Sequence, residues 1–245
     1  MHYLLIFLAG IAAGFVNTLA GGGSTLTLAA LTFAGLPSTV ANATNRVAIF
    51  FQTAVATSQF KRHDQLKIKP ILPITLAAII GAIWGSFFAT RISSETFDIV
   101  LGVIFIFILI MMLRPKKKSE DNKKQLPRWA EVLIFLGVGF YGGFVQAGVG
   151  FIFLATLNLV ESFDLVKANA AKVFIILCYT VFSLIVFASS GKIMWIYGLV
   201  LAAGNMIGAY IGALSAIKQG EKIVKIVLVI AIGFACLKLF GVIQI

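Results

Sequence analysis

The chain has 245 residues, of which 60% are hydrophobic and 12% charged, with a mean hydropathy of +1.02 and a net charge of +11. This composition is typical of a protein that lies in lipid rather than in water. Most basic residues gather in two polar stretches between apolar runs, 61–69 and 114–128, as in the cytoplasmic loops of membrane proteins, so we expect no nucleic-acid partner.

The first half of the chain consists of apolar runs separated by short breaks. The run 3–20 is interpreted as a membrane helix rather than a signal peptide, because no basic segment precedes it. Three consecutive glycines, 21–23, end this run, since glycine has a high entropy cost inside a helix. The apolar segment 24–34 is too short to span, and the sequence leaves open whether it crosses or dips in and returns. Three longer apolar runs follow, at 40–60, 71–90 and 97–113.

The second half repeats this order after the basic linker 114–128, which separates a first repeat, 1–113, from a second, 129–245. A glycine break at 148–150 again divides a long apolar run from a short one. The runs of this half are 130–147, 151–160, 168–190, 194–217 and 223–243.

Several short motifs of the two halves align in the same order. Gly14-Phe15-Val16-Asn17 matches Gly143-Phe144-Val145-Gln146, and Ala41-Asn42-Ala43 matches Ala168-Asn169-Ala170. The apolar runs and this duplication predict an all-α polytopic membrane protein with about seven to ten membrane elements, short broken segments included. Repeats with glycine-interrupted segments at corresponding positions are typical of transporters, with the binding site at the breaks.

The basic loops predict the orientation of the helices. Loops 61–69, 114–128 and 218–225 are expected in the cytoplasm and the turn 91–96 outside, together with the N-terminus. Because 218–225 corresponds to 91–96 in the repeat, the two halves are predicted to be inverted.

Two cations lie inside apolar runs, Arg46 and Lys172. A charge at membrane depth is costly and normally faces a protein interior or a functional path. No carboxylate occurs in either surrounding segment, so a negative substrate could be the missing partner. Snorkelling to the interface and binding of a lipid head group are the alternatives. Polar residues near the cations or breaks join them as candidate ligands, with polar contacts between helices as the alternative role. These residues are Asn42, Asn45, Asn169, Asn17 and Gln146.

Backbone amides at the glycine breaks form the second part of the predicted site. Non-helical backbone in a membrane must line a cavity or pack against protein, and helix N-termini favour anions. Close packing of helices through small residues is the alternative. The candidate residues are Gly21, Gly22, Gly23, Ser24, Gly148 and Gly150.

No pattern of catalytic or metal-binding residues is evident. Neither metal-ligand spacing nor a nucleotide-binding glycine motif occurs, and Cys178 and Cys236 lie in apolar runs, where we interpret them as buried hydrophobic residues. We therefore expect no enzyme, no cofactor and no metal.

Several of these segments resemble the TauE/SafE sulfite-exporter family. The similar segments are the opening 10–24, Gly35-Leu36-Pro37 with the following 41–45, and the second glycine-rich stretch 142–150. The resemblance implies an inner-membrane protein of about eight helices that exports or takes up a sulfur-containing anion such as sulfite or a sulfonate.

Together these features predict a secondary transporter with one central anion site, worked by alternating access as the two halves move against each other. An anion channel and a non-transporting membrane scaffold are the alternatives. The expected partners are the small anion and membrane lipid, and a homo-oligomer is left open.

Overall fold

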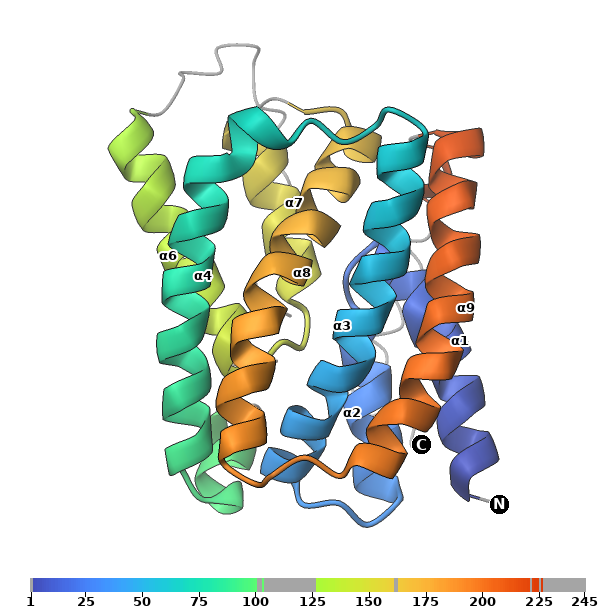
Figure 1. The fold of residues 1–245 in the computed structure, drawn as a ribbon, viewed down its shortest axis with the longest axis vertical. Helices are drawn as coiled ribbons and strands as arrows, with labels where there is room; N and C mark the ends of the chain where they lie inside the picture. The colour runs from blue at the N-terminus through green and yellow to red at the C-terminus, as the bar shows by residue number, and fades with distance from the viewer. Residues whose placement is uncertain are drawn as a thin grey trace.

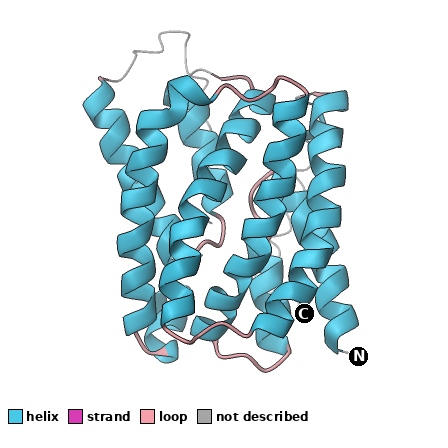
Figure 2. Cartoon of the chain, viewed as in Figure 1, coloured by secondary structure: helices cyan, strands magenta, loops and turns pink. Residues whose placement is uncertain are grey.

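The computed structural model describes residues 2–100, 103, 127–160, 163–220, 222–224 and 226. These residues form helices and turns and no strand, as the all-α prediction requires (Figure 2). Residues 114–126 of the predicted linker 114–128 and most of the runs 97–113 and 223–243 lie outside the described residues.

Within the described residues, α1 to α4 of the first half have bounds close to the predicted runs. A short pair opens this half: α1 (His2–Leu19) and α2 (Ser24–Phe33). Two long helices follow, α3 (Ser38–Arg62) and α4 (Ile68–Arg91). Gly35 has a φ of +91°, which ends α2, and Pro37 directly precedes α3.

The second half has the same sequence of short and long helices. The short pair is α6 (Arg128–Phe144) and α7 (Val149–Val160). The long helices are α8 (Leu165–Ser189) and α9 (Trp195–Gln219). Four helices of the described chain are long and apolar enough to cross a membrane: α1, α4, α8 and α9.

The two short pairs enter the bundle from opposite ends (Figure 1). Helix α1 rises from the lower end and stops near the middle, and α2 returns to that end. Helix α6 descends from the upper end, and α7 returns upward. The long helices α3 and α9 run upward and α4 and α8 downward, so corresponding helices of the two halves have opposite directions.

Glycines determine which helices pack most closely. A Cβ atom on Gly204 or Gly208 of α9 would overlap carbonyl oxygens of α1, and one on Gly81 or Gly85 of α4 would overlap those of α6. Glycine therefore allows the backbones of each pair to touch. Helix α9 of the second half thus packs against α1 of the first half, and α4 of the first half packs against α6 of the second.

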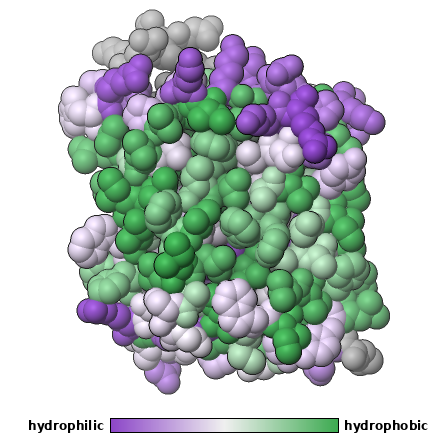
Figure 3. All heavy atoms as spheres, viewed as in Figure 1, coloured by the Kyte–Doolittle hydropathy of each residue, from purple (hydrophilic) through white to green (hydrophobic). Residues whose placement is uncertain are grey.

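The surface has an apolar belt between polar ends (Figure 3). Exposed Leu, Ile, Phe and Trp side chains form the belt, as expected for contact with lipid acyl chains. The hydrophilic atoms are densest at the upper end, where α3 and α9 end and α4 and α8 begin. The exposed basic residues of these segments include Lys61, Arg62, Lys67, Lys69, Arg128, Lys167, Lys218 and Lys222.

Candidate functional site

The first break lies between α1 and α2. Gly21 has a φ of +96°, and its amide donates to the carbonyl of Val16. Within the described residues, the amides of Gly22, Gly23 and Ser24 have no hydrogen-bond acceptor. These amides form the N-terminal, positive end of α2 inside the bundle.

The second break lies between α6 and α7 and meets the first. Gln146 and Gly148 have φ values of +66° and +71°, and the amides of Gly148 and Gly150 have no acceptor in the described chain. The backbones of Gly150 and Gly21 are in contact, so closely that a Cβ on either would overlap the other. The N-terminal ends of two half-helices from opposite halves are thus brought together in the interior.

Arg46 on α3 reaches across to the carboxyl end of α6. Its Nη1 donates to the carbonyl of Gly142 at 2.6 Å and to Oε1 of Gln146, and its Nη2 donates to the carbonyl of Gly143 at 2.8 Å and to Oδ1 of Asn42 at 3.4 Å. The guanidinium lies 5.1 Å from the ring centroid of Phe187. Arg46 is fully buried and does not snorkel to an interface.

Lys172 on α8 makes the corresponding contacts at the carboxyl end of α1. Its Nζ donates to the carbonyls of Asn17 and Thr18, both at 3.1 Å, and to Oδ1 of Asn169 at 2.7 Å. Lys172 is also fully buried. Within the described residues neither cation has a carboxylate partner, so both positive charges remain uncompensated by a negative side chain.

Amide side chains connect the breaks to the long helices. Asn17 donates to Oγ of Ser24 at 3.1 Å and to Oε1 of Gln52 at 3.2 Å, and the same Gln52 oxygen accepts from Asn205 at 3.0 Å. At the other break, Oε1 of Gln146 accepts from the hydroxyl of Tyr179 at 3.1 Å as well as from Arg46.

A few buried polar atoms in this region have no partner in the described chain. Both amide atoms of Asn45 and Nε of Arg46 lack a hydrogen bond, as do Oδ1 of Asn205 and Oγ1 of Thr18. Buried polar groups are normally satisfied, so such atoms indicate water or a ligand.

The structure brings most of the predicted residues together around the two breaks. Asn42 and Asn169 lie beside their cations, and Asn17 and Gln146 lie at the breaks with the glycines and Ser24. Tyr179 was not predicted as part of the site, although the internal repeat places it at the position of Gln52, ten residues after the aligned asparagine.

This arrangement suits an anion. Backbone amides at helix N-termini and buried cations without carboxylate partners produce a positive potential in the interior of the bundle. Within the described residues no three His, Cys, Asp or Glu side chains gather in a way that could hold a metal ion.

Comparison with known proteins agrees with a membrane transporter. The family model for "Sulfite exporter TauE/SafE" matches residues 6–239. "Probable membrane transporter protein ORF9" of Sinorhizobium sp is 30% identical over 92% of this chain and 87% of its own length. YfcA of Escherichia coli K12 is 27% identical over 96% of this chain and 88% of its own length. YunE of Bacillus subtilis is 24% identical over 96% of this chain and 97% of its own length. Both bear the same description, probable membrane transporter protein.

No solved structure matches the chain. The family model covers nearly all of it, and the relatives align along almost their full lengths. The chain is therefore a multi-pass membrane transporter of the TauE/SafE family.

Proposed function

We propose that this protein is a secondary transporter of a small sulfur-containing anion, such as sulfite or a sulfonate. The observation that carries the proposal is the meeting of two half-helix N-termini, at Ser24 and Val149, beside two buried cations without carboxylate partners. The description of the family as sulfite exporters supports the sulfur class.

In the proposed site the anion binds where the two glycine breaks meet. The amides of Gly22, Gly23, Ser24, Gly148 and Gly150 supply hydrogen-bond donors, because they have no other acceptor in the described chain. Arg46 and Lys172 supply the positive charge. Amide side chains complete the site: Asn17, Asn42, Asn45, Gln146 and Asn169.

We propose further that the two halves are inverted repeats with about eight crossings in all. The opposite entry of the pairs α1–α2 and α6–α7, and the opposite directions of the corresponding long helices, support this arrangement. The basic upper end then faces the cytoplasm of a cell whose inner membrane holds the protein.

We expect alternating access in this fold to move groups of helices that pack closely against each other. The glycine contacts join α9 to α1 and α4 to α6. Ile6, Leu31 and Leu201 belong to one hydrophobic cluster, whereas Ile74, Phe135 and Phe153 belong to another, which also includes Ile49 of α3. We propose that α1, α2, α3 and α9 form one moving group and α4, α6, α7 and α8 the other. All side chains of the site are buried, so transport requires these groups to separate on one side at a time.

Flux into proteoliposomes loaded with a panel of sulfite, sulfonates and carboxylates tests this function. Saturable, counterflow-competent flux of a sulfur anion is expected. Single-channel currents would instead indicate a channel, and no flux or binding of any anion would indicate a scaffold. Saturable transport of a carboxylate alone would reject the sulfur class.

A further inference from the structure

The carboxyl ends of α1 and α6 are held in the same way by the opposite half of the chain. The carbonyls of the last three residues of α6 accept hydrogen bonds from α3: Gly142 and Gly143 from Arg46, and Phe144 from Nδ2 of Asn42 at 2.9 Å. The last three carbonyls of α1 accept from α8 in the corresponding way. Those of Asn17 and Thr18 accept from Lys172, and that of Leu19 accepts from Nδ2 of Asn169 at 2.9 Å.

Each asparagine also connects to its own cation. Oδ1 of Asn42 accepts from Arg46 and Oδ1 of Asn169 from Lys172, one turn along the same helix. Each asparagine and its cation therefore act together as one cap, which donates hydrogen bonds to the last three carbonyls of a helix. Such a cap is needed because a helix that ends inside a membrane leaves its last carbonyls without partners, at the negative end of its dipole.

The cap uses nearly all the hydrogen-bond donors of both cations. An ammonium group has three N–H donors, and Nζ of Lys172 has three acceptors. The four N–H donors on the two Nη atoms of Arg46 have four acceptors, and Nε alone has none. A substrate that bound directly to either cation would have to displace these carbonyls, and among them only that of Gly143 accepts from a further side chain in the described chain, Oγ of Ser86 at 3.1 Å.

We propose that Arg46 and Lys172 are positioning residues that act through the helix ends they hold, and that neither side chain is a direct ligand of the anion. Each cation fixes the break of the opposite half, so the two breaks keep their relative position and their amides converge. The link between the caps and transport rests on the proposed function, whereas the caps themselves do not depend on it.

Exchange of the cations separates positioning from direct contact. A ligand role for Arg46 depends on the planar fork of its guanidinium, which lysine lacks. A capping role needs only a buried cation with several donors, as Lys172 demonstrates on α1. The informative variant is therefore Arg46→Lys, with Arg46→Met as the variant that removes the cap and Lys172→Arg as the matched exchange.

Sulfite flux in proteoliposomes and thermal unfolding in detergent provide the two measurements. For Arg46→Lys we expect a slower maximal rate, a KM within about threefold of wild type, and a melting temperature close to wild type. For Arg46→Met we expect a melting temperature lower by about 5 °C or more, because buried carbonyls lose their donors. A KM raised tenfold or more in Arg46→Lys, with an unchanged melting temperature, would show direct contact and overturn the proposal.

A second measurement keeps the test decisive for variants that fold poorly. Asn42→Ala and Asn169→Ala remove one donor of each cap and leave both charges in place. Because asparagine and cation act together, the melting shifts of Asn42→Ala and Arg46→Met should be non-additive in the double variant. Additive shifts would overturn the shared cap. If wild type carries no anion, the proposed function fails, and this melting cycle still tests the caps.

Discussion

Gly21 and Gly150 lie backbone against backbone at the centre of the bundle, and neither leaves room for the Cβ atom of the other. One belongs to the break of the first half and the other to the break of the second. Two glycine breaks that are remote in sequence can thus meet, because neither of these glycines has a side chain. The position of one half-helix N-terminus determines the position of the other.

Substitution of Gly150 tests this contact. Gly150 lies in the first turn of α7, where alanine would favour the helix by about 1 kcal/mol if space existed. The overlap with Gly21 should outweigh this, so Gly150→Ala is expected to lower the stability by about 1–3 kcal/mol and to stop transport. Thermal unfolding and flux measure both effects. Gly137→Ala on α6 is the control, since nothing lies near its Cβ position, and equal melting temperatures for the two variants would contradict the contact.

A disulfide between α4 and α8 tests which helices move together. Oγ of Ser86 donates to Oγ of Ser183 at 2.8 Å, although the two serines belong to different sequence halves. In a background without Cys178 and Cys236, oxidised Ser86→Cys/Ser183→Cys is expected to transport as fast as the reduced protein, because both helices lie in one proposed group. The single-cysteine variants are the controls. Loss of flux on oxidation, restored by reduction, would instead assign motion to the sequence halves.

The helices of the fold follow from the sequence because glycine breaks and apolar runs are local features. The run 40–60 lies within α3, and the run 168–190 lies within α8 except for its last residue. Both breaks occur where consecutive or closely spaced glycines were identified. The sequence could not predict that α4 packs against α6 of the second half and that α9 packs against α1 of the first half. It depends on glycines of one helix fitting carbonyls of another, and small residues do not specify their partner.

The sequence predicted which residues belong to the candidate site better than it predicted the contacts that they make. The missing partners of Arg46 and Lys172 are backbone carbonyls, and every residue carries one, so composition cannot identify which carbonyls lack a donor. The lack of a nearby carboxylate therefore has two explanations, an anionic substrate and an exposed helix end. Only the positions of the helix ends distinguish them.

Single cysteines test the sidedness of the basic end. Lys67 and Lys222 are exposed at the upper end, and Ser93 is exposed in the turn at the lower end. An impermeant thiol reagent added to intact cells is expected to label Ser93→Cys and to spare Lys67→Cys and Lys222→Cys. Permeabilised cells provide the control, in which all three should react. Labelling of Lys222→Cys from outside would contradict the inverted arrangement and leave the duplication intact.

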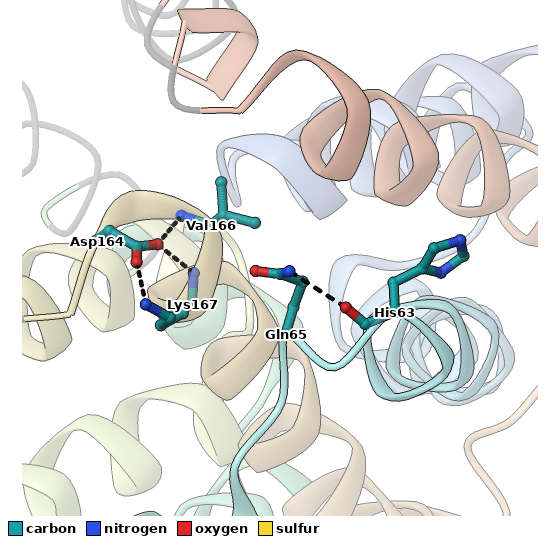
Figure 4. Close-up of polar contacts among 5 residues, drawn as sticks. All are labelled: His63, Gln65, Asp164, Val166 and Lys167. Carbon is teal, nitrogen blue, oxygen red and sulfur yellow. Dashed lines mark hydrogen bonds and ion pairs between the residues drawn. The ribbon is translucent and has the colours of Figure 1, made fainter.

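Asp164 provides a pH-sensitive cap at the start of α8. Its Oδ1 accepts from the amides of Val166 at 3.1 Å and Lys167 at 2.8 Å, and its Oδ2 pairs with Nζ of Lys167 at 2.8 Å (Figure 4). Burial by itself raises the pKa of this carboxyl, but the hydrogen bonds from Lys167 and Val166 outweigh burial and hold the pKa below its ordinary value. The ionised form is thus favoured in the folded protein.

The depressed pKa sets the direction of the pH effect on stability. The stabilisation is present above the unfolded pKa of about 3.9 and is lost as the pH falls through the lower folded pKa. Asp164→Ala should cost about 1 kcal/mol at neutral pH, since the cap is lost. Asp164→Asn keeps an acceptor and should remove this part of the acid sensitivity. Melting temperatures between neutral and acidic pH check both, and an unchanged acid profile in Asp164→Asn would contradict the assignment.

Substitution of Asn45 distinguishes most clearly between a side chain that contacts the ligand and one that only packs in the interior. It is fully buried, and neither atom of its amide has a partner in the described chain, an arrangement that costs about 1–3 kcal/mol. Leucine has a similar size, so Asn45→Leu should leave the protein as stable as wild type or more stable. If the amide binds the anion during transport, the KM should rise about tenfold, for a loss of about 1.4 kcal/mol. Asn205→Leu is the control, because Asn205 donates to Gln52 and its loss should lower stability. A more stable Asn45→Leu variant with an unchanged KM would exclude Asn45 from the site.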